Sequence, residues 1–339
     1  MAESRVRRGR WAAWLASAVL VVLAGSPSVG LGAPTMPPLA LEATIPLKGV
    51  DGRIDHLAVD LGRERLIVAE LGNNTIDVID LRARAVVHRI AGVKEPQGVA
   101  YLKGPDRIAV ASAAEGTVRM FDAGDFSPAG VVELGDDADN LRVDGDRLVV
   151  GYGAGALAWL DPTRGTKVLN IPLAGHPEGF QLHPRDSRVF VNVPDARQIA
   201  VVDRKAGDAV AAWSTEGLRS NFPLAINATG DSVATVFRSP SKLALYSTER
   251  GAISAQADTC GDADDVFFDA KRVRVYVSCG SGAVDVFEQK ENGLSALGRV
   301  PTASGARTSL FVPELDRLFV AARASGRAAA AILVLRPTQ

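Results

Sequence analysis

Short runs of apolar residues alternate with clusters of Gly, Asp, Asn and Pro along almost the whole chain. Six of these runs begin with Arg and continue with aliphatic or β-branched residues, as at 65–69, 107–111 and 274–278. Runs of this length bounded by turn residues predict β-strands. Apart from the N-terminus, no segment has the i, i+3, i+4, i+7 spacing of an amphipathic helix, so the pattern predicts an all-β protein.

The strand pattern returns at nearly constant intervals. The position just before the first apolar run of each unit is occupied by Asp55, Gln97, Asp139, Glu178, Phe222, Asp264 and Thr308, at steps of 42, 42, 39, 44, 42 and 44 residues. Each unit holds up to four apolar runs, and four strands at this period are typical of propeller blades. The sequence predicts one seven-bladed β-propeller domain over 40–337, with blades at about 52–93, 94–135, 136–175, 176–217, 218–261, 262–305 and 306–337.

The last unit lacks its fourth run, because the chain ends soon after the apolar run at 331–335. The missing piece is found near the N-terminus, where Ile-Pro-Leu-Lys-Gly at 45–49 repeats the fourth-run ending Ile-Pro-Leu-Ala-Gly at 171–175. We therefore expect residues 41–48 to pair with the last blade. This pairing would close the ring and remove the exposed sheet edges of an open array.

The N-terminal residues 1–32 are expected to be a signal peptide rather than part of the fold. Four arginines within 5–10 precede an apolar stretch at 11–24 and then small residues, which is the layout of a secretory signal. The apolar stretch is shorter than the ~20 residues needed to cross a bilayer. We expect a periplasmic or secreted protein with no transmembrane segment in the mature chain.

The two cysteines, Cys260 and Cys279, would then lie in an oxidising compartment. Both are expected on one face of the ring, in the loop that leads into the sixth blade and at the end of that blade's second strand. A disulfide between them is sterically reasonable, and two separate buried thiols are the alternative.

Composition limits the partners. The chain has 339 residues, 47% of them hydrophobic, and a formal net charge of -1. It can bury a large core, but it offers no electrostatic field for a polyanion, so nucleic acid is not an expected partner.

Polar residues concentrate where the innermost strand of each blade begins, around one mouth of the central channel. Four carboxylates from four blades share one position there, and their repulsion requires relief by water, by protonation, by Arg307 or by a cation. The alternative is that these side chains cap loops and strand ends. The expected ligand-binding residues are Asp55, His56, Gln97, Asp139, Asn140, His176, Glu178, Asn221, Asp264, Asp265, Arg307 and Thr308.

A divalent metal is a possible occupant of this mouth. Imidazole with carboxylate suits a transition metal, whereas a ring of carboxylates and amides suits Ca²⁺. The candidate metal ligands are His56, His176, Asp139, Glu178 and Asp264.

With the blades aligned, the phrases Asp55-His56, 95–98, 136–140, 176–179, 221–223, 262–265 and 305–308 fall at equivalent places. On these phrases and the repeated strands, residues 40–337 resemble the YVTN-type, YncE-like seven-bladed propeller family of exported bacterial proteins. The resemblance implies the fold and export but no single activity. More distantly similar propellers include lactonases and a metal-dependent antibiotic lyase, which implies only that a site lies at the channel mouth.

Two functional hypotheses follow. The first is a monomeric, exported binding module that holds a small polar or cationic molecule, or a partner protein, at the channel mouth. The second is a metal-dependent lyase or hydrolase, similar to lactonases, with His176 and Glu178 as catalytic candidates and Glu178 as the base. The chain has no Gly-x-Ser-x-Gly elbow and no His-Glu-x-x-His pair, so nucleophilic catalysis has no sequence support.

Overall fold

The structure is a computed structural model that describes residue 1 and residues 36–339, except 216, 292 and 327. The fold is formed by Pro37–Gln339, and the description below concerns this unit alone. The expected signal peptide, residues 1–32, lies outside the described residues except for Met1. None of the helices formed by the described residues is long and apolar enough to cross a membrane.

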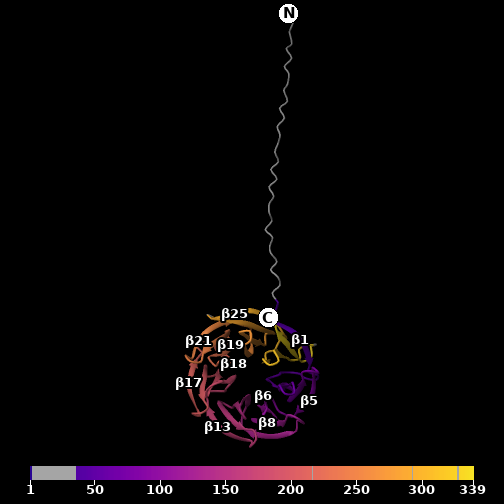
Figure 1. Ribbon diagram of the computed structural model, residues 1–339, viewed down its shortest axis with the longest axis vertical. Coiled ribbons are helices and arrows are strands. Elements are labelled where there is room, and N and C mark those ends of the chain that lie inside the picture. The colour runs from indigo at the N-terminus through magenta and orange to yellow at the C-terminus, as the bar shows by residue number, and fades with distance from the viewer. Residues whose placement is uncertain (2–35, 216, 292, 327) are drawn as a thin grey trace. The chain divides into compact units, whose positions relative to one another are not determined.

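Among the described residues, seven four-stranded antiparallel sheets stand around a central axis as propeller blades (Figure 1). Blades 1 to 4 are built from β2 (Leu57–Asp60), β3 (Arg65–Glu70), β4 (Thr75–Asp80), β5 (Ala85–Ala91), β6 (Pro96–Leu102), β7 (Arg107–Ser112), β8 (Thr117–Asp122), β9 (Pro128–Glu133), β10 (Ala138–Asp144), β11 (Arg147–Tyr152), β12 (Ala156–Asp161), β13 (Thr166–Pro172), β14 (Phe180–Leu182), β15 (Arg188–Val193), β16 (Gln198–Asp203) and β17 (Asp208–Ser214). Blades 5 to 7 are built from β18 (Arg219–Ile226), β19 (Ser232–Ser239), β20 (Ser241–Ser247), β21 (Ala252–Asp258), β22 (Ala263–Asp269), β23 (Arg274–Cys279), β24 (Ala283–Lys290), β25 (Gly293–Pro301), β26 (Ser309–Val312), β27 (Arg317–Ala322), β28 (Ala331–Pro337) and β1 (Leu39–Pro46). The predicted seven-bladed, all-β architecture is confirmed.

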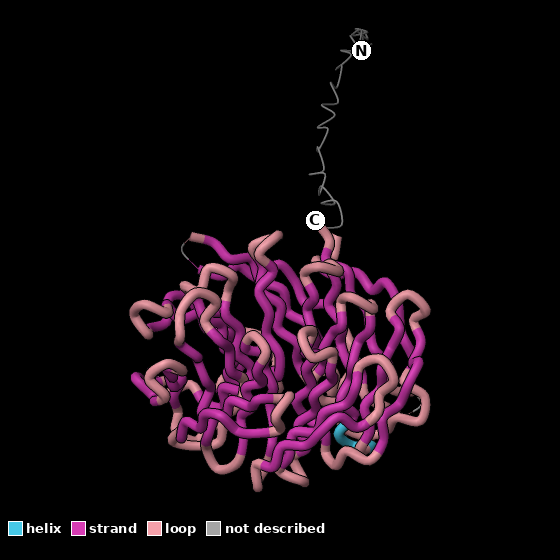
Figure 2. Tube along the Cα trace, turned by 60° about the horizontal axis from the view of Figure 1, so that its bottom comes forward, coloured by secondary structure: helices cyan, strands magenta, loops and turns pink. Residues whose placement is uncertain are grey.

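Strands make up nearly all of the regular structure, and the short 3-10 helix Leu71–Asn73 is the helical segment drawn in Figure 2. The second strand of a blade is buried on both faces, as in β3 and β7, because neighbouring blades cover it. Such strands read as continuous apolar runs. The outermost strands alternate instead, as in β21, since one face meets solvent.

The turns that follow the third strands depend on an aspartate. Asp122, Asp161 and Asp203 each accept hydrogen bonds from backbone N–H groups two and three residues further along, at 2.8 to 3.2 Å. This is the local pairing that makes Asp a frequent turn residue. It explains why the third apolar run of these blades ends on Asp.

The ring closes through the N-terminal strand, as predicted. β1 pairs antiparallel with β28, with Leu39 opposite Pro337 and Pro46 opposite Ala331, and forms the outermost strand of blade 7. The observed strand lies two residues earlier than the expected 41–48. Figure 1 shows β1 close to the C-terminus.

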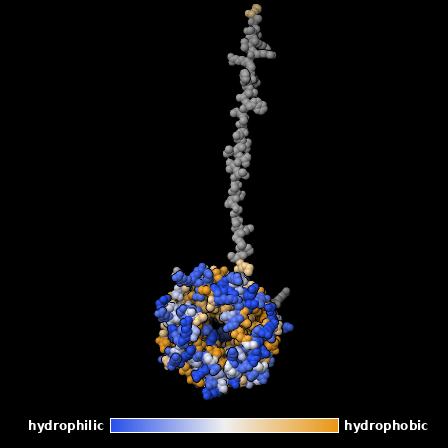
Figure 3. Space-filling view, in the orientation of Figure 1, coloured by the Kyte–Doolittle hydropathy of each residue, from blue (hydrophilic) through white to orange (hydrophobic). Residues whose placement is uncertain are grey.

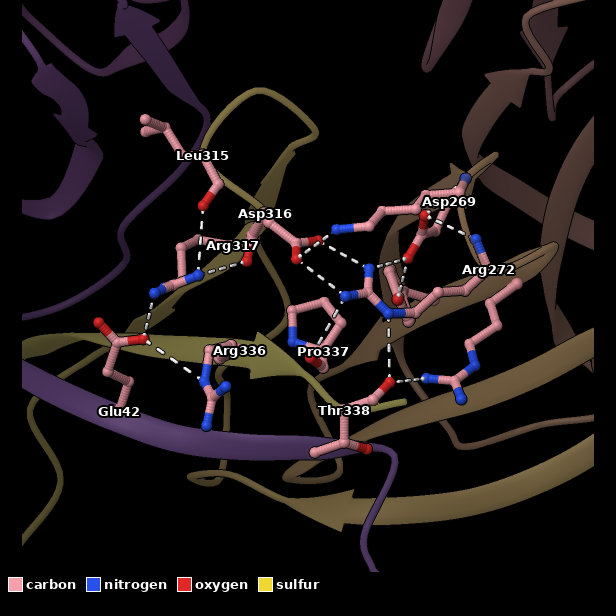
Figure 4. A network of polar contacts seen from close by, with 12 residues as sticks. Glu42, Asp269, Arg272, Leu315, Asp316, Arg317, Arg336, Pro337 and Thr338 are labelled. Carbon is pink, nitrogen blue, oxygen red and sulfur yellow. Dashed lines mark hydrogen bonds and ion pairs between the residues drawn. The ribbon is translucent and has the colours of Figure 1, made fainter.

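Ion pairs and backbone contacts reinforce this closure (Figure 4). Arg272 of blade 6 donates two hydrogen bonds to Asp316 of blade 7, at 2.7 and 2.8 Å, and one to the Thr338 carbonyl at 3.2 Å. Glu42 of β1 forms an ion pair with Arg317 of β27 at 2.6 Å. The Arg272 contacts join blade 6 to the C-terminal end of blade 7, and the Glu42–Arg317 pair joins the closing strand to β27 within blade 7.

Cys260 and Cys279 form a disulfide, which confirms the predicted pairing over the alternative of two free thiols. Their Cα atoms are 5.8 Å apart. Both side chains are buried beside the hydrophobic core between blades 5 and 6.

Candidate functional site

The inner strands begin around one opening of the channel, and there the structure contains a cavity of about 380 Å³. Figure 3 shows the hollow at the centre of the ring. The cavity is lined by Arg53, Asp55, His56, Gln97, Asp137, Asp139, Asn140, Arg142, His176, Glu178, Gly179, Phe222, Pro223, Leu224, Arg238, Asp264, Asp265 and Arg307. We call it the mouth cavity.

All but two of the twelve expected ligand-binding residues line the mouth cavity; the exceptions are Asn221 and Thr308. Asn221 is fully buried and donates hydrogen bonds to Asn192 Oδ1 at 2.9 Å and to the Gln198 carbonyl at 3.1 Å. Thr308 is also buried and donates to the Ile54 carbonyl at 3.1 Å. Each of the two side chains therefore joins neighbouring blades and lies outside the lining of the mouth cavity.

Three arginines of the mouth cavity were not expected from the sequence: Arg53, Arg142 and Arg238. Arg53 lies two residues before Asp55 and pairs with it at 2.8 Å. Arg238, at the end of β19, reaches Asp264 at 2.6 Å and stacks 4.0 Å from the centre of the Phe222 ring.

The expected Arg307 pairs with the second oxygen of Asp264 at 2.8 Å. Two of the four carboxylates at the shared position, Asp55 and Asp264, are therefore neutralised by arginine. This accounts for part of the relief that the sequence required.

The remaining carboxylates surround His176. Its Nδ1 donates a hydrogen bond to the Gly153 carbonyl at 2.7 Å, and its Nε2 lies 3.6 Å from Asp139 Oδ2. The interaction with Asp139 raises the pKa of His176 to about 9. Burial and the nearby Asp139 charge raise the pKa of Glu178 to about 8. At neutral pH this side of the cavity thus combines an imidazolium with a protonated carboxyl group.

Burial shifts the pKa values of His56 and its neighbour Asp55 in opposite directions, because it disfavours the charged form of each group. It raises the pKa of Asp55 to about 6 despite the Arg53 partner, and it lowers the pKa of His56 below its ordinary value. His56 Nε2 lies 3.6 Å from Asp55 Oδ1. His56 is therefore neutral at pH 7, in contrast to His176.

The expected metal ligands do not form a coordination group. Across residue 1 and the described parts of 36–339, no set of three or more His, Cys, Asp or Glu side chains has the geometry to hold a metal ion. Asp264 is held by two arginines, and His176 uses Nδ1 for a backbone carbonyl. The set His56, His176, Asp139, Glu178 and Asp264 thus lines one cavity without converging on one point.

Comparison by sequence identifies no relative of this chain. No family model matches the sequence. No curated protein matches it either.

Among solved structures, a chain in the crystal structure of the mitotic checkpoint complex is similar over 96% of this chain and 100% of its own, with a TM-score of 0.77 and 13% identity. A chain of hydrazine synthase from Kuenenia stuttgartiensis is similar over 81% and 95%, with a TM-score of 0.66 and 15% identity. At these identities the likeness shows the β-propeller fold alone. Membership of the YVTN-type family stays a prediction.

Proposed function

We propose that this propeller is a binding module whose mouth cavity holds a small polar molecule with a cationic group. The observation that carries the proposal is the uneven pairing of charges in the cavity. Asp55 and Asp264 have arginine partners, whereas Asp137 and Asp139 share the single imidazolium of His176, and none of Asp137, Asp139 and Glu178 has an Arg or Lys within 4.0 Å among the described residues. An ammonium group at this side would supply the missing counter-charge.

The protonation of this side supports the same conclusion. Glu178 keeps its proton at neutral pH because burial and Asp139 disfavour a further negative charge. A bound cation reverses that penalty and releases the proton. Binding of a cation is therefore expected to tighten as the pH rises from 6 to 8.

We prefer a binding role to the alternative of a metal-dependent lyase or hydrolase. The sequence has no recognisable nucleophile motif, and the described residues assemble no metal ligand group. The rigid ring instead presents polar side chains from all seven blades to one cavity. A preorganised cavity loses little entropy when a ligand binds.

The test is a calorimetric titration with putrescine, a small diammonium ion, and with butanediol, its neutral isostere. We expect putrescine to bind and butanediol not to bind. The double variant Asp139→Asn, Glu178→Gln should weaken putrescine binding by roughly tenfold or more, since each hydrogen bond to a charged group is worth about 1.5–3 kcal/mol. Asp136→Asn removes an exposed carboxylate just outside the cavity and serves as the matched control.

Equal affinities of the double variant and the Asp136→Asn control would contradict the proposal. Binding of butanediol as tightly as putrescine would contradict it as well.

We further propose that the protein works outside the cytoplasm, in the periplasm or as a secreted protein. Support comes from the signal-like sequence of residues 1–32 and from the buried disulfide between Cys260 and Cys279. Cell fractionation of the full chain should recover a shortened, oxidised protein in the exported fraction. A full-length protein with free thiols in the cytoplasm would contradict this location.

A further inference from the structure

A second cavity of about 300 Å³, which we call the channel cavity, adjoins the mouth cavity along the inner strands. It is lined mainly by apolar side chains of the inner strands, among them Val59, Val99, Tyr101, Val143, Phe267 and Leu310. His56, Arg142 and Asp265 line both cavities and therefore mark the boundary between them.

Arg142 is the unusual member of this boundary. It comes from β10, and its guanidinium lies 5.4 Å from the centre of the Phe180 ring. Its Nη1 donates to the Leu141 carbonyl at 2.7 Å and to Asn140 Oδ1 at 3.4 Å. Its Nε is buried without a hydrogen-bond partner, and its Nη2 donates to no acceptor among the described residues.

No described carboxylate lies within 4.0 Å of Arg142, whereas Arg53, Arg238 and Arg307 each pair with at least one. The nearest candidates are engaged elsewhere. Asp265 Oδ2 accepts a hydrogen bond from the Ser309 N–H at 2.6 Å, and Asp139 faces His176.

Arginine keeps its charge in proteins, so the partly buried Arg142 guanidinium is a cation with no carboxylate partner within 4.0 Å among the described residues. Burial of an unpaired charge is costly, and an anion in the channel would remove the cost. The planar guanidinium is suited to a carboxylate. The apolar walls of the channel cavity, which Arg142 also lines, are suited to a hydrocarbon group.

We propose that Arg142 binds the carboxylate of a small aliphatic acid whose hydrocarbon chain occupies the channel cavity. This subsite is distinct from the cation site proposed for the mouth cavity, because it uses a different residue, Arg142, and binds a ligand group of opposite charge. The carboxylate would provide the counter-charge for Arg142. The hydrocarbon chain would lose its contact with water against Val99, Tyr101 and Leu310.

The experiment is a calorimetric titration of the full mature protein with acetate, butyrate and hexanoate, and with hexanol as the neutral counterpart of hexanoate. Affinity should rise by roughly fourfold for each methylene that enters the channel cavity, which corresponds to about 0.8 kcal/mol. Hexanol should bind at least tenfold more weakly than hexanoate. Equal binding of acetate and hexanoate, or of hexanol and hexanoate, would overturn the proposal.

Variants identify the two parts of the subsite. Arg142→Gln should weaken hexanoate binding by roughly 10- to 100-fold, and Arg142→Lys should retain part of it. Arg219→Gln removes an exposed arginine of β18 and is the matched control. Val143→Trp fills the channel cavity from an exposed position, so it should abolish the gain from acetate to hexanoate but leave acetate binding in place.

Unchanged hexanoate affinity in Arg142→Gln would overturn the assignment to Arg142. If Arg142→Gln does not fold, the comparison of hexanoate with hexanol on the unaltered protein still decides the question. Failure here is separable from failure of the mouth site, because putrescine and hexanoate are measured independently on the same protein.

Discussion

The closure of the ring by β1 makes a sharp prediction about stability. Ile45 lies opposite Ile332 in the β1–β28 pair, is only 1% exposed and belongs to the core between blades 7 and 1. Ile45→Ala should lower the free energy of unfolding by about 3 kcal/mol, because it removes buried methyl groups and leaves a cavity. For a domain of this size that corresponds to roughly 5 °C in Tm.

The matched control lies in the same strand. Leu41 is 60% exposed, so Leu41→Ala should change stability by no more than about 0.5 kcal/mol. Thermal melts of both variants, followed by circular dichroism, provide the measurement. Equal Tm values would refute the idea that the inner face of β1 seals the ring. Deletion of residues 34–50 should have a larger effect and yield a protein that aggregates or melts early, whereas melting at the parent temperature would refute closure altogether.

Three further predictions concern the disulfide, the charged cavity and the blade interfaces. Replacing Cys260 and Cys279 by Ser, which opens a link across 19 positions, should lower the free energy of unfolding by roughly 3 kcal/mol in a denaturant titration; an unchanged midpoint would contradict this. The pKa of Glu178 is raised from 4.5 to about 8, so its contribution to stability is complete below pH 4.5 and is lost as the pH rises through 8. Glu178→Gln should therefore match the parent Tm at pH 5 and exceed it at pH 9, and a variant that is no more stable at pH 9 would refute the assigned protonation. Asn221→Ala should cost about 1–3 kcal/mol of stability without altering putrescine affinity, and a weakened affinity would return Asn221 to the binding site.

The fold could be predicted from the sequence because each blade repeats one pattern of burial. Second strands such as β3 are covered on both faces and read as uninterrupted apolar runs, and the Asp-containing turns punctuate them. The closing strand could be predicted because its ending at 45–49 repeats the ending of another fourth strand. Its bounds, two residues earlier than expected, depend on pairing with β28 and are not encoded in that short phrase.

The candidate site was predicted in part. Alignment of the repeats identified the carboxylates of the mouth cavity, because each blade contributes one residue at the same height. The same alignment does not distinguish Asn221, which is buried outside the mouth cavity, from Arg307, which occupies the equivalent position of blade 7 and lines the cavity. Thr308 shares its alignment position with Asp55, but its short side chain reaches only the Ile54 carbonyl.

The arginines were missed for different reasons. Arg142 occupies a position where the other blades carry Ala, Phe or Gln, so the one charge in an otherwise uncharged alignment column was an available signal. Arg238 lies beyond the end of the repeating pattern, in a strand two residues longer than β3. Its reach to Asp264 requires the three-dimensional placement of two blades.

The most direct test of the proposed function is the number of protons released when putrescine binds at pH 7. Calorimetric titrations in two buffers of different ionisation enthalpy give this number. We predict a net release of protons that disappears in Glu178→Gln, because the incoming cation favours the ionised carboxylate. Binding heats that are independent of the buffer, or the same release in Glu178→Gln, would contradict a cation site at this side of the mouth cavity.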